Sequence, residues 1–226
     1  MSNIKLVIFD LDGTAADTME GIVAALNRTM TEGGYPTHTR ESVLKFVNYN
    51  TRRYIEEALP PEAREDAVID RLLERYTHHY ESTYTLTTPY EGVPALLRRL
   101  SESCLVAINS NKQDAFVKAL AEKLFSDIPL VAAEGYRPDR PHKPDPTMAY
   151  AIMDMASERL GVTLTPDRCV YVGDSDVDYH TAVNAGMIPV SVSWGYRSHE
   201  FLSALGDQAV ARNTEELWEI LNQIGG

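Results

Sequence analysis

Short apolar segments that alternate with helical stretches constrain the fold of this chain more than any other feature. Each segment is a few residues long and most read as buried strands, because parallel strands covered on both faces are apolar throughout. They lie at Ile4-Phe9, Leu105-Ile108, Leu130-Ala133, Val170-Val172 and Pro189-Val192, with a weaker one near Ala209-Ala211. Strands joined by helices make right-handed crossovers that cover a parallel sheet on both sides. The sequence therefore predicts a doubly wound, Rossmann-like α/β core.

The region from about Asp17 to Leu86 breaks this alternation. It contains no convincing strand and reads as successive helices, and its length fits a chain of 226 residues that carries one insertion. Breaks between the helices come from glycine and proline at Gly33-Gly34, Pro36 and Pro60-Pro61, and Pro89 with Gly92 marks the return. We therefore expect an all-helical domain over residues 17–86, inserted into a core of residues 1–16 and 87–226.

Composition narrows the classes of partner. The chain is 44% hydrophobic and 24% charged, which is typical of a globular protein, and its net charge is -12. This charge argues against general binding to nucleic acid or to an anionic membrane, which requires basic patches. An anionic substrate such as a phosphate would need local cations or a metal. No segment reads as a leader or as the roughly 18 apolar residues of a membrane helix, so the expected compartment is the cytoplasm.

An acidic motif follows the first predicted strand directly. It reads Asp10-Leu11-Asp12-Gly13-Thr14, and ligands of open α/β sheets bind beyond the carboxyl ends of the strands. Both carboxylates are thus presented where a site belongs. An aspartate-glycine turn that closes a strand is also common structural punctuation, so this motif alone does not decide the function.

Three further polar segments follow later strands. Ser110-Asn111-Lys112 comes after the second core strand, where we expect it to open a helix and suit an anionic oxygen. Lys143 precedes Pro144-Asp145-Pro146 at the start of the next helix. Val172-Gly173-Asp174-Ser175-Asp176-Val177-Asp178 brings more carboxylates to another strand end. Carboxylates gathered with Asp10 and Asp12 would repel one another unless a hard cation such as Mg²⁺ is bound.

Taken in this order, the four segments resemble the haloacid dehalogenase-like (HAD) phosphatase superfamily, in its phosphoglycolate phosphatase-like branch with a helical cap domain. The resemblance covers essentially the whole chain. It implies that Asp10 is the nucleophile and that Asp12 is the general acid and base. It also implies that Ser110, the N–H of Asn111 and Lys143 bind the phosphoryl group, in a site that includes Gly13 and Thr14.

The same resemblance implies a magnesium site. Its ligands would be Asp10, the backbone carbonyl of Asp12 and Asp174, with Asp178 in a supporting position. The presence of Asp12 disfavours the metal-free dehalogenases of the superfamily, which lack this second aspartate.

The helical domain would then be the cap that reads the leaving group. Many caps of this branch carry a Gly-x-Gly turn, but this chain has Asn48-Tyr49-Asn50 followed by Thr51-Arg52-Arg53. Asn48, Asn50 and Arg52 offer donors for a carboxylate or a hydroxyl-rich leaving group, and the departure puts phosphoglycolate itself in doubt. Arginines on a solvated helix face are the competing interpretation.

Several alternatives stay open at this point. The expected activity is hydrolysis of a small phosphate monoester, either phosphoglycolate-like or a sugar phosphate. A phosphomutase of the β-phosphoglucomutase type, a pyrophosphatase and a catalytically silent binding module use or retain the same core. Tyr76, Tyr80 and Tyr84 recur at a spacing of four, which suits packing inside the cap or against a second copy of the chain, so a homodimer is one expectation.

Overall fold

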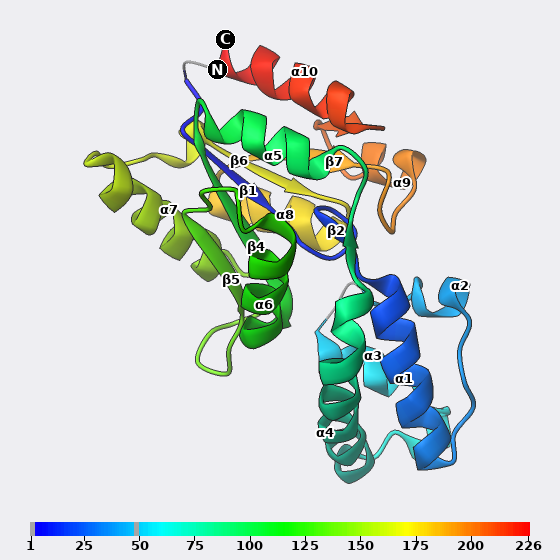
Figure 1. Cartoon of the computed structure of the whole chain (residues 1–226). Coiled ribbons are helices and arrows are strands. Elements are labelled where there is room, and N and C mark those ends of the chain that lie inside the picture. Colours follow the sequence, from blue (N-terminus) through cyan, green and yellow to red (C-terminus); the bar gives the residue numbers. More distant parts are fainter. Residues whose placement is uncertain (1–2, 48–49) are drawn as a thin grey trace. The chain divides into compact units, whose positions relative to one another are not determined.

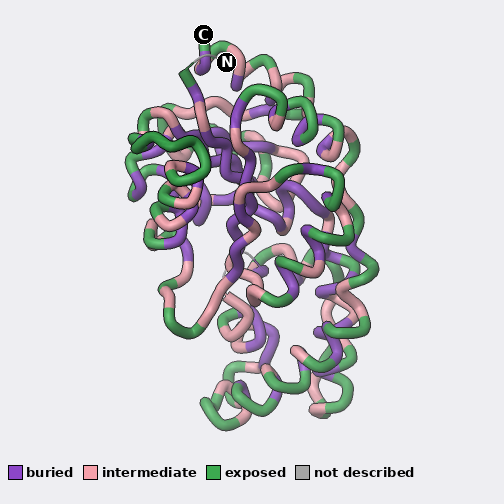
Figure 2. Tube along the Cα trace, turned by 60° about the vertical axis from the view of Figure 1, so that its left-hand side comes forward, coloured by how far each residue is buried: buried purple, intermediate pink, exposed green. Residues whose placement is uncertain are grey.

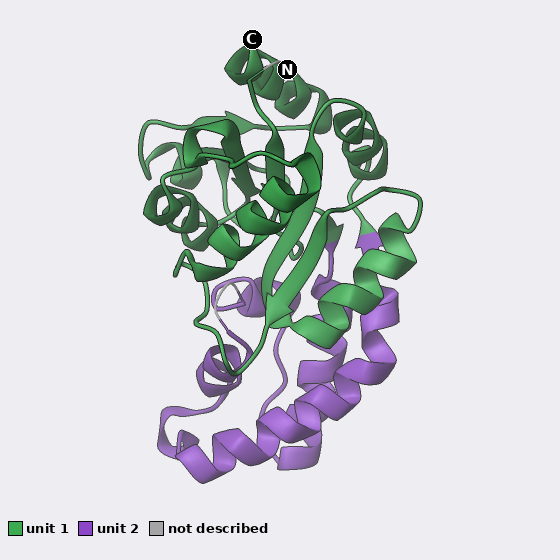
Figure 3. Cartoon of the chain, turned by 90° about the vertical axis from the view of Figure 1, so that its left-hand side faces the viewer, with its two compact units in different colours: residues 1–16, 89–226 green, residues 17–88 purple. Residues whose placement is uncertain are grey.

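The computed structural model describes residues 3–47 and 50–226. It divides into two compact units, one of residues 1–16 and 89–226 and the other of residues 17–88 (Figure 3). The chain passes between them along two short strands, β2 (Ala16–Asp17) and β3 (Thr88–Pro89), which pair as a two-stranded sheet. Each unit is described by itself.

The larger unit is built on a parallel sheet (Figure 1). Its 6 strands lie in the order β5-β4-β1-β6-β7-β8, and every neighbouring pair is parallel. The strands are β1 (Leu6–Phe9), β4 (Leu105–Gln113), β5 (Ala132–Tyr136), β6 (Cys169–Gly173), β7 (Ile188–Val192) and β8 (Ala209–Ala211). This arrangement confirms the predicted doubly wound α/β core.

The strand register brings the acidic motifs together. β1 is central, and Phe9 at its end pairs with Ile108 of β4 on one side and with Val172 of β6 on the other. The chain order runs outward from β1 in both directions, so β1 lies at the point where the winding reverses. Ligand sites of open α/β sheets lie at such a point, beyond the carboxyl ends of the strands.

Helices cover this sheet and bury its apolar residues. They are α5 (Val93–Ser101), α6 (Asp114–Phe125), α7 (Thr147–Leu160), α8 (Asp176–Ala185), α9 (His199–Ser203) and α10 (Thr214–Gly225), with a 3₁₀ turn at Pro166–Arg168. Side chains alternate along a strand, so Leu6 and Ile8 share one face, where both are fully buried in a cluster with Ile152 of α7 and Ala182 of α8. Figure 2 shows the buried residues concentrated along these strands.

The smaller unit is helical. Its helices are α1 (Met19–Gly33), α2 (Arg40–Val43), α3 (Thr51–Ala58) and α4 (Asp66–Thr83), with 3₁₀ turns at Pro61–Ala63 and Tyr84–Leu86. α1 packs against α4, and Gly21 permits the close approach, because a Cβ there would lie 2.6 Å from the carbonyl oxygen of Thr83. Tyr76 and Tyr80 are buried, and Tyr76 packs edge to face on Tyr54. Packing inside this unit therefore accounts for these two tyrosines.

One sequence prediction about the core is wrong. Ser110-Asn111-Lys112 does not open a helix, because β4 continues to Gln113 and α6 begins at Asp114. Asn109 of β4 pairs with Glu134 of β5, and the next pair is Gln113 with Tyr136. Four residues of β4 therefore span the same length as two residues of β5, so β4 bulges there. Bulges re-aim side chains and are frequent beside active sites. Within the described residues, no helix has the length and apolar character needed to span a membrane.

Candidate active site

Three buried aspartates converge where β1 and β6 end. Asp10 follows β1, Asp174 follows β6, and Asp178 lies in the first turn of α8. One carboxylate oxygen from each lies within 4.8 Å of the others, and each residue is at most 5% exposed. Gly173 is required beside them, because a Cβ there would lie 2.1 Å from Cβ of Asp178.

Burial in this cluster opposes ionisation. It raises the pKa of Asp10 well above its usual value, against the attraction of Lys143 and with added repulsion from Asp178 and Asp174. Burial also raises the pKa of Asp174 to about 7, and the charge of Asp178 adds to this effect. The three aspartates offer hard oxygen ligands. Their negative charge is only partly balanced by the single positive charge of Lys143. A divalent cation such as Mg²⁺ fits these oxygens.

Lys143 supplies positive charge to the same cluster. Its Nζ donates to Oδ1 of Asp10 and to Oδ1 of Asp178, both at 2.7 Å. Burial alone would lower its pKa, but the charges of Asp10 and Asp178 outweigh burial and raise it. Asn111 fixes the lysine backbone, since its side chain accepts from the Lys143 N–H at 2.8 Å and donates to the Lys143 carbonyl at 3.2 Å. The side chain of Asn111 is therefore used to hold Lys143.

Asp12 lies apart from the three clustered aspartates. Its Oδ2 accepts a hydrogen bond from Oγ of Ser110 at 3.0 Å, and its Oδ1 lies 2.8 Å from Nζ of Lys112. The structure thus brings Ser110 to Asp12. No role for Lys112 was expected from the sequence. Its spacing of two from Ser110 becomes a signal only once β4 is known to extend to Gln113, because residues two apart on a strand share one face.

The turn after β1 and the loop after β7 together orient Asp174. Thr14 is fully buried and its hydroxyl donates to Oδ1 of Asp174 at 3.1 Å. The N–H of Tyr196 donates to Oδ2 at 2.6 Å. Gly13 has a φ of +90° and stands against the same carboxylate, where a Cβ would lie 2.3 Å from Oδ2. Gly13 and Thr14, predicted as phosphate-binding residues, are thus seen in contact with a candidate metal ligand.

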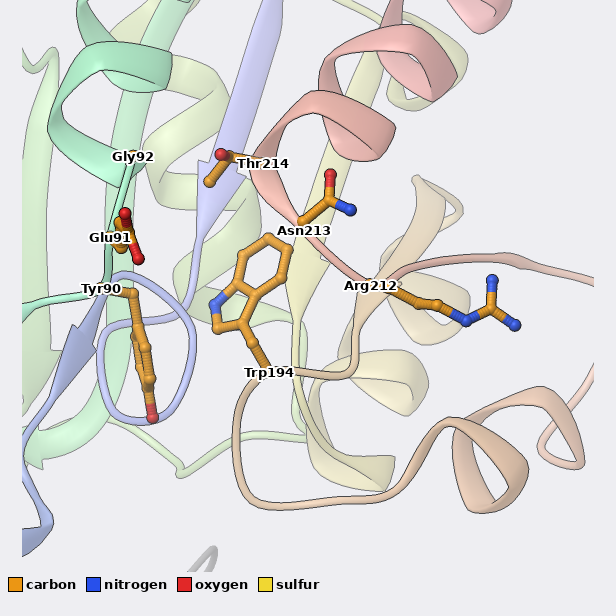
Figure 4. A pocket seen from close by; sticks show the side chains of 7 residues that line it. All are labelled: Tyr90, Glu91, Gly92, Trp194, Arg212, Asn213 and Thr214. Carbon is orange, nitrogen blue, oxygen red and sulfur yellow. The ribbon is translucent and has the colours of Figure 1, made fainter.

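A cavity of about 380 Å³ is lined by residues from Tyr90 to Gly92, by Trp194 and by residues from Arg212 to Thr214 (Figure 4). Its lining includes Tyr90 and Trp194, which both hydrogen-bond to the turn. The indole N–H of Trp194 donates to the Thr14 carbonyl at 3.0 Å, and the Tyr90 N–H donates to the Ala15 carbonyl at 3.3 Å. The loop that begins at Trp194 is therefore part of the framework of the site.

The candidate residues of the helical unit have partners within it. Asn50 caps α3 by accepting from the Arg53 N–H at 2.9 Å. Arg52 is paired with Asp70 and, at 2.5 Å, with Asp66, both on α4. These contacts favour the interpretation of Arg52 as part of an ion-paired helix surface. Asn48 lies outside the described residues.

Comparisons with known proteins agree with this geometry. The sequence model of the haloacid dehalogenase-like hydrolase family matches residues 7–192. The phosphoglycolate phosphatase of Xanthomonas campestris pv. campestris is 31% identical over 224 residues, which cover 95% of each chain. That of Rhodospirillum rubrum is also 31% identical, over 98% of this chain and 93% of the relative.

A solved structure extends the likeness to three dimensions. A proposed phosphoglycolate phosphatase from Lactobacillus delbrueckii subsp. bulgaricus superposes with a TM-score of 0.86 at 29% identity, over 96% of this chain and 98% of that one. The match therefore includes the helical insertion as well as the sheet. The chain belongs to the haloacid dehalogenase-like hydrolase family, in its phosphoglycolate phosphatase-like branch.

Proposed function

We propose that this phosphatase hydrolyses a small phosphate monoester with the help of Mg²⁺, through a phospho-aspartyl intermediate on Asp10. The observation that carries the proposal is the buried group in which Nζ of Lys143 lies 2.7 Å from both Asp10 and Asp178, beside Asp174. Burying such opposite charges costs free energy, and buried groups of this kind are typical of catalytic and ligand-binding sites. The similarity to phosphoglycolate phosphatases over nearly the full length supports it.

Asp10, Asp174 and Asp178 would hold the metal, together with the backbone carbonyl of Asp12. When bound, Mg²⁺ would supply positive charge beside the phosphoryl oxygens and the nucleophile. At about 4 Å, two like charges repel by roughly 4 kcal/mol at an effective dielectric near 20. Lys143 opposes the same repulsion from the protein side, because it already contacts Asp10.

In the first half of the reaction, a carboxylate oxygen of Asp10 attacks phosphorus, and the bond between phosphorus and the alcohol oxygen breaks. Asp12 gives its proton to the departing alcohol, and Asp10 carries the phosphoryl group as an acyl phosphate. Ser110 and the N–H of Asn111 hold the phosphoryl oxygens. Phosphoryl transfer requires little beyond such positioning and charge stabilisation.

In the second half, a water molecule attacks phosphorus and passes a proton to Asp12. The bond between phosphorus and Asp10 breaks, which releases inorganic phosphate and restores the free carboxylate. The contacts of Asp12 place it beside Ser110, so one carboxyl group can serve both proton transfers.

The relatives and the helical unit support one class of substrate. The curated relatives are named as phosphoglycolate phosphatases, which supports a small, carboxylated or hydroxylated leaving group. The helical unit would exclude water and read this group. A binding module without activity is disfavoured because Asp10, Asp12, Ser110 and Lys143 are all present.

The test is free phosphate released with and without Mg²⁺ from phosphoglycolate, sugar monophosphates, nucleotides, pyrophosphate and an aryl phosphate. Continuous, Mg²⁺-dependent release from one class of monoester is the expected result, and Asp10→Asn is the matched inactive control. Preference for pyrophosphate would assign a pyrophosphatase. Activity that requires a sugar bisphosphate activator and releases little phosphate would assign a mutase.

A further inference from the structure

Lys112 holds one oxygen of the Asp12 carboxylate while Ser110 holds the other. Nζ of Lys112 lies 2.8 Å from Oδ1 of Asp12. The side chain of Lys112 is 9% exposed and that of Asp12 is 18% exposed. Ser110 donates to Oδ2 at 3.0 Å and accepts from the Lys112 N–H at 3.1 Å. This is a largely shielded pair joined to a hydrogen-bond network, unlike an isolated surface ion pair.

The bulge in β4 brings Lys112 to this place. Ser110 and Lys112 share a face of the strand and point to Asp12, whereas Asn111 points the other way and holds the backbone of Lys143. The neighbouring strand approaches so closely that a Cβ on Gly135 would lie 2.5 Å from the Lys112 carbonyl oxygen. The approach of β5 therefore restricts the backbone that carries Lys112.

We propose that Lys112 is a positioning residue that keeps the Asp12 carboxylate in place for proton transfer, an inference that rests on the proposed function. A serine hydroxyl has one proton to donate. When Ser110 turns this proton to a phosphoryl oxygen, its donation to Asp12 ends. The contact with Lys112 persists through that change and keeps the carboxylate within reach of the leaving oxygen.

The test compares Lys112→Met and Lys112→Arg with Lys118→Met. Lys118 is a matched control because it also pairs with an aspartate, Asp114 at 2.7 Å, but its side chain is 51% exposed and neither residue is given a role in the proposed chemistry. The readouts are kcat/KM for phosphoglycolate, or for the alkyl phosphate that wild type turns over best, kcat/KM for 4-nitrophenyl phosphate, and inhibition by inorganic phosphate. A nitrophenolate leaves without much need of a proton, so it reports on steps that do not depend on Asp12.

For Lys112→Met we expect kcat/KM for the alkyl phosphate to fall by about 10- to 100-fold, the usual cost of loosening a positioned group. The value for 4-nitrophenyl phosphate and the inhibition constant of phosphate should change little. Lys112→Arg should recover part of the loss, and Lys118→Met should match wild type.

Two results would overturn the inference. Equal losses of kcat/KM on both substrates, with or without weaker inhibition by phosphate, would mean that Lys112 binds phosphate or only supports the fold. Unchanged kinetics would mean that the contact of Lys112 with Asp12 has no role. Wild type that releases no phosphate with Mg²⁺ from any compound of the panel would instead refute the proposed function, and with it this inference.

Discussion

Gly195→Ala tests whether the loop after β7 sets the position of the Asp174 carboxylate, a proposed ligand of the metal. A Cβ on Gly195 would lie 2.1 Å from the Gly13 carbonyl oxygen and 2.4 Å from Oδ2 of Asp174. The loop has to move by about 1 Å to restore van der Waals separation. That shift would take the Tyr196 N–H, now 2.6 Å from Oδ2, out of hydrogen-bonding distance. A hydrogen bond to a charged group contributes about 1.5–3 kcal/mol, and losing such a partner lowers metal affinity by about 10- to 100-fold.

The assay is calorimetric titration of Mg²⁺ at constant pH, together with the Mg²⁺ dependence of phosphate release. Gly161→Ala is the control, because Gly161 has a φ of +69° and open space around its Cβ position. It should lose about 1–2 kcal/mol of stability through backbone strain and keep its Mg²⁺ affinity. Equal affinities in the two variants would refute the link between the loop and Asp174.

Three other expectations follow from the site and from the helical unit. Asp10→Asn should lower kcat by at least about a thousandfold and leave the unfolding temperature close to wild type, and near-normal turnover would exclude Asp10 as the nucleophile. The pKa of Asp174 is raised to about 7, so the metal-free fold binds extra protons and loses stability as the pH rises from about 4 to 7. Mg²⁺ has to displace these protons when it binds. The increase in unfolding temperature caused by Mg²⁺ should therefore become larger between about pH 5.5 and 8. An increase that is the same at every pH would contradict this reasoning. Arg52→Ala should leave KM unchanged, because the guanidinium is paired with Asp66 and Asp70, whereas a clear rise in KM would show that Arg52 binds substrate.

The sheet and the meeting of the acidic motifs could be predicted from the sequence because both follow from chain order. A parallel sheet places every strand end at one edge, so Asp10 and Asp174 had to gather once their strands were identified. Burial patterns were also readable, since continuous apolar runs predict strands covered on both faces. These inferences need no knowledge of how individual side chains turn.

The contacts of Lys112 and of the loop from Trp194 could not be predicted in the same way. Lys112 reaches Asp12 because β4 bulges and extends to Gln113, which depends on its pairing with β5 and not on local propensity. The loop reaches Asp174 through a backbone N–H of Tyr196, a group that every residue except proline carries. Arg52 presents the reverse case: its donors suggested a substrate ligand, whereas its ion pairs with Asp66 and Asp70 favour the competing interpretation of a helix surface.

The pairing of β2 with β3 closes the inserted helical unit at its base. Its two ends enter and leave the core as neighbouring strands, so for the core sheet the insertion is equivalent to a loop of arbitrary length. Each doubling of a flexible loop costs only about 0.6 kcal/mol in closure entropy. An insertion at this base can therefore be enlarged, reduced or replaced over evolution at little cost to the sheet. Under the proposed function, this lets the choice of leaving group diverge while the chemistry stays constant.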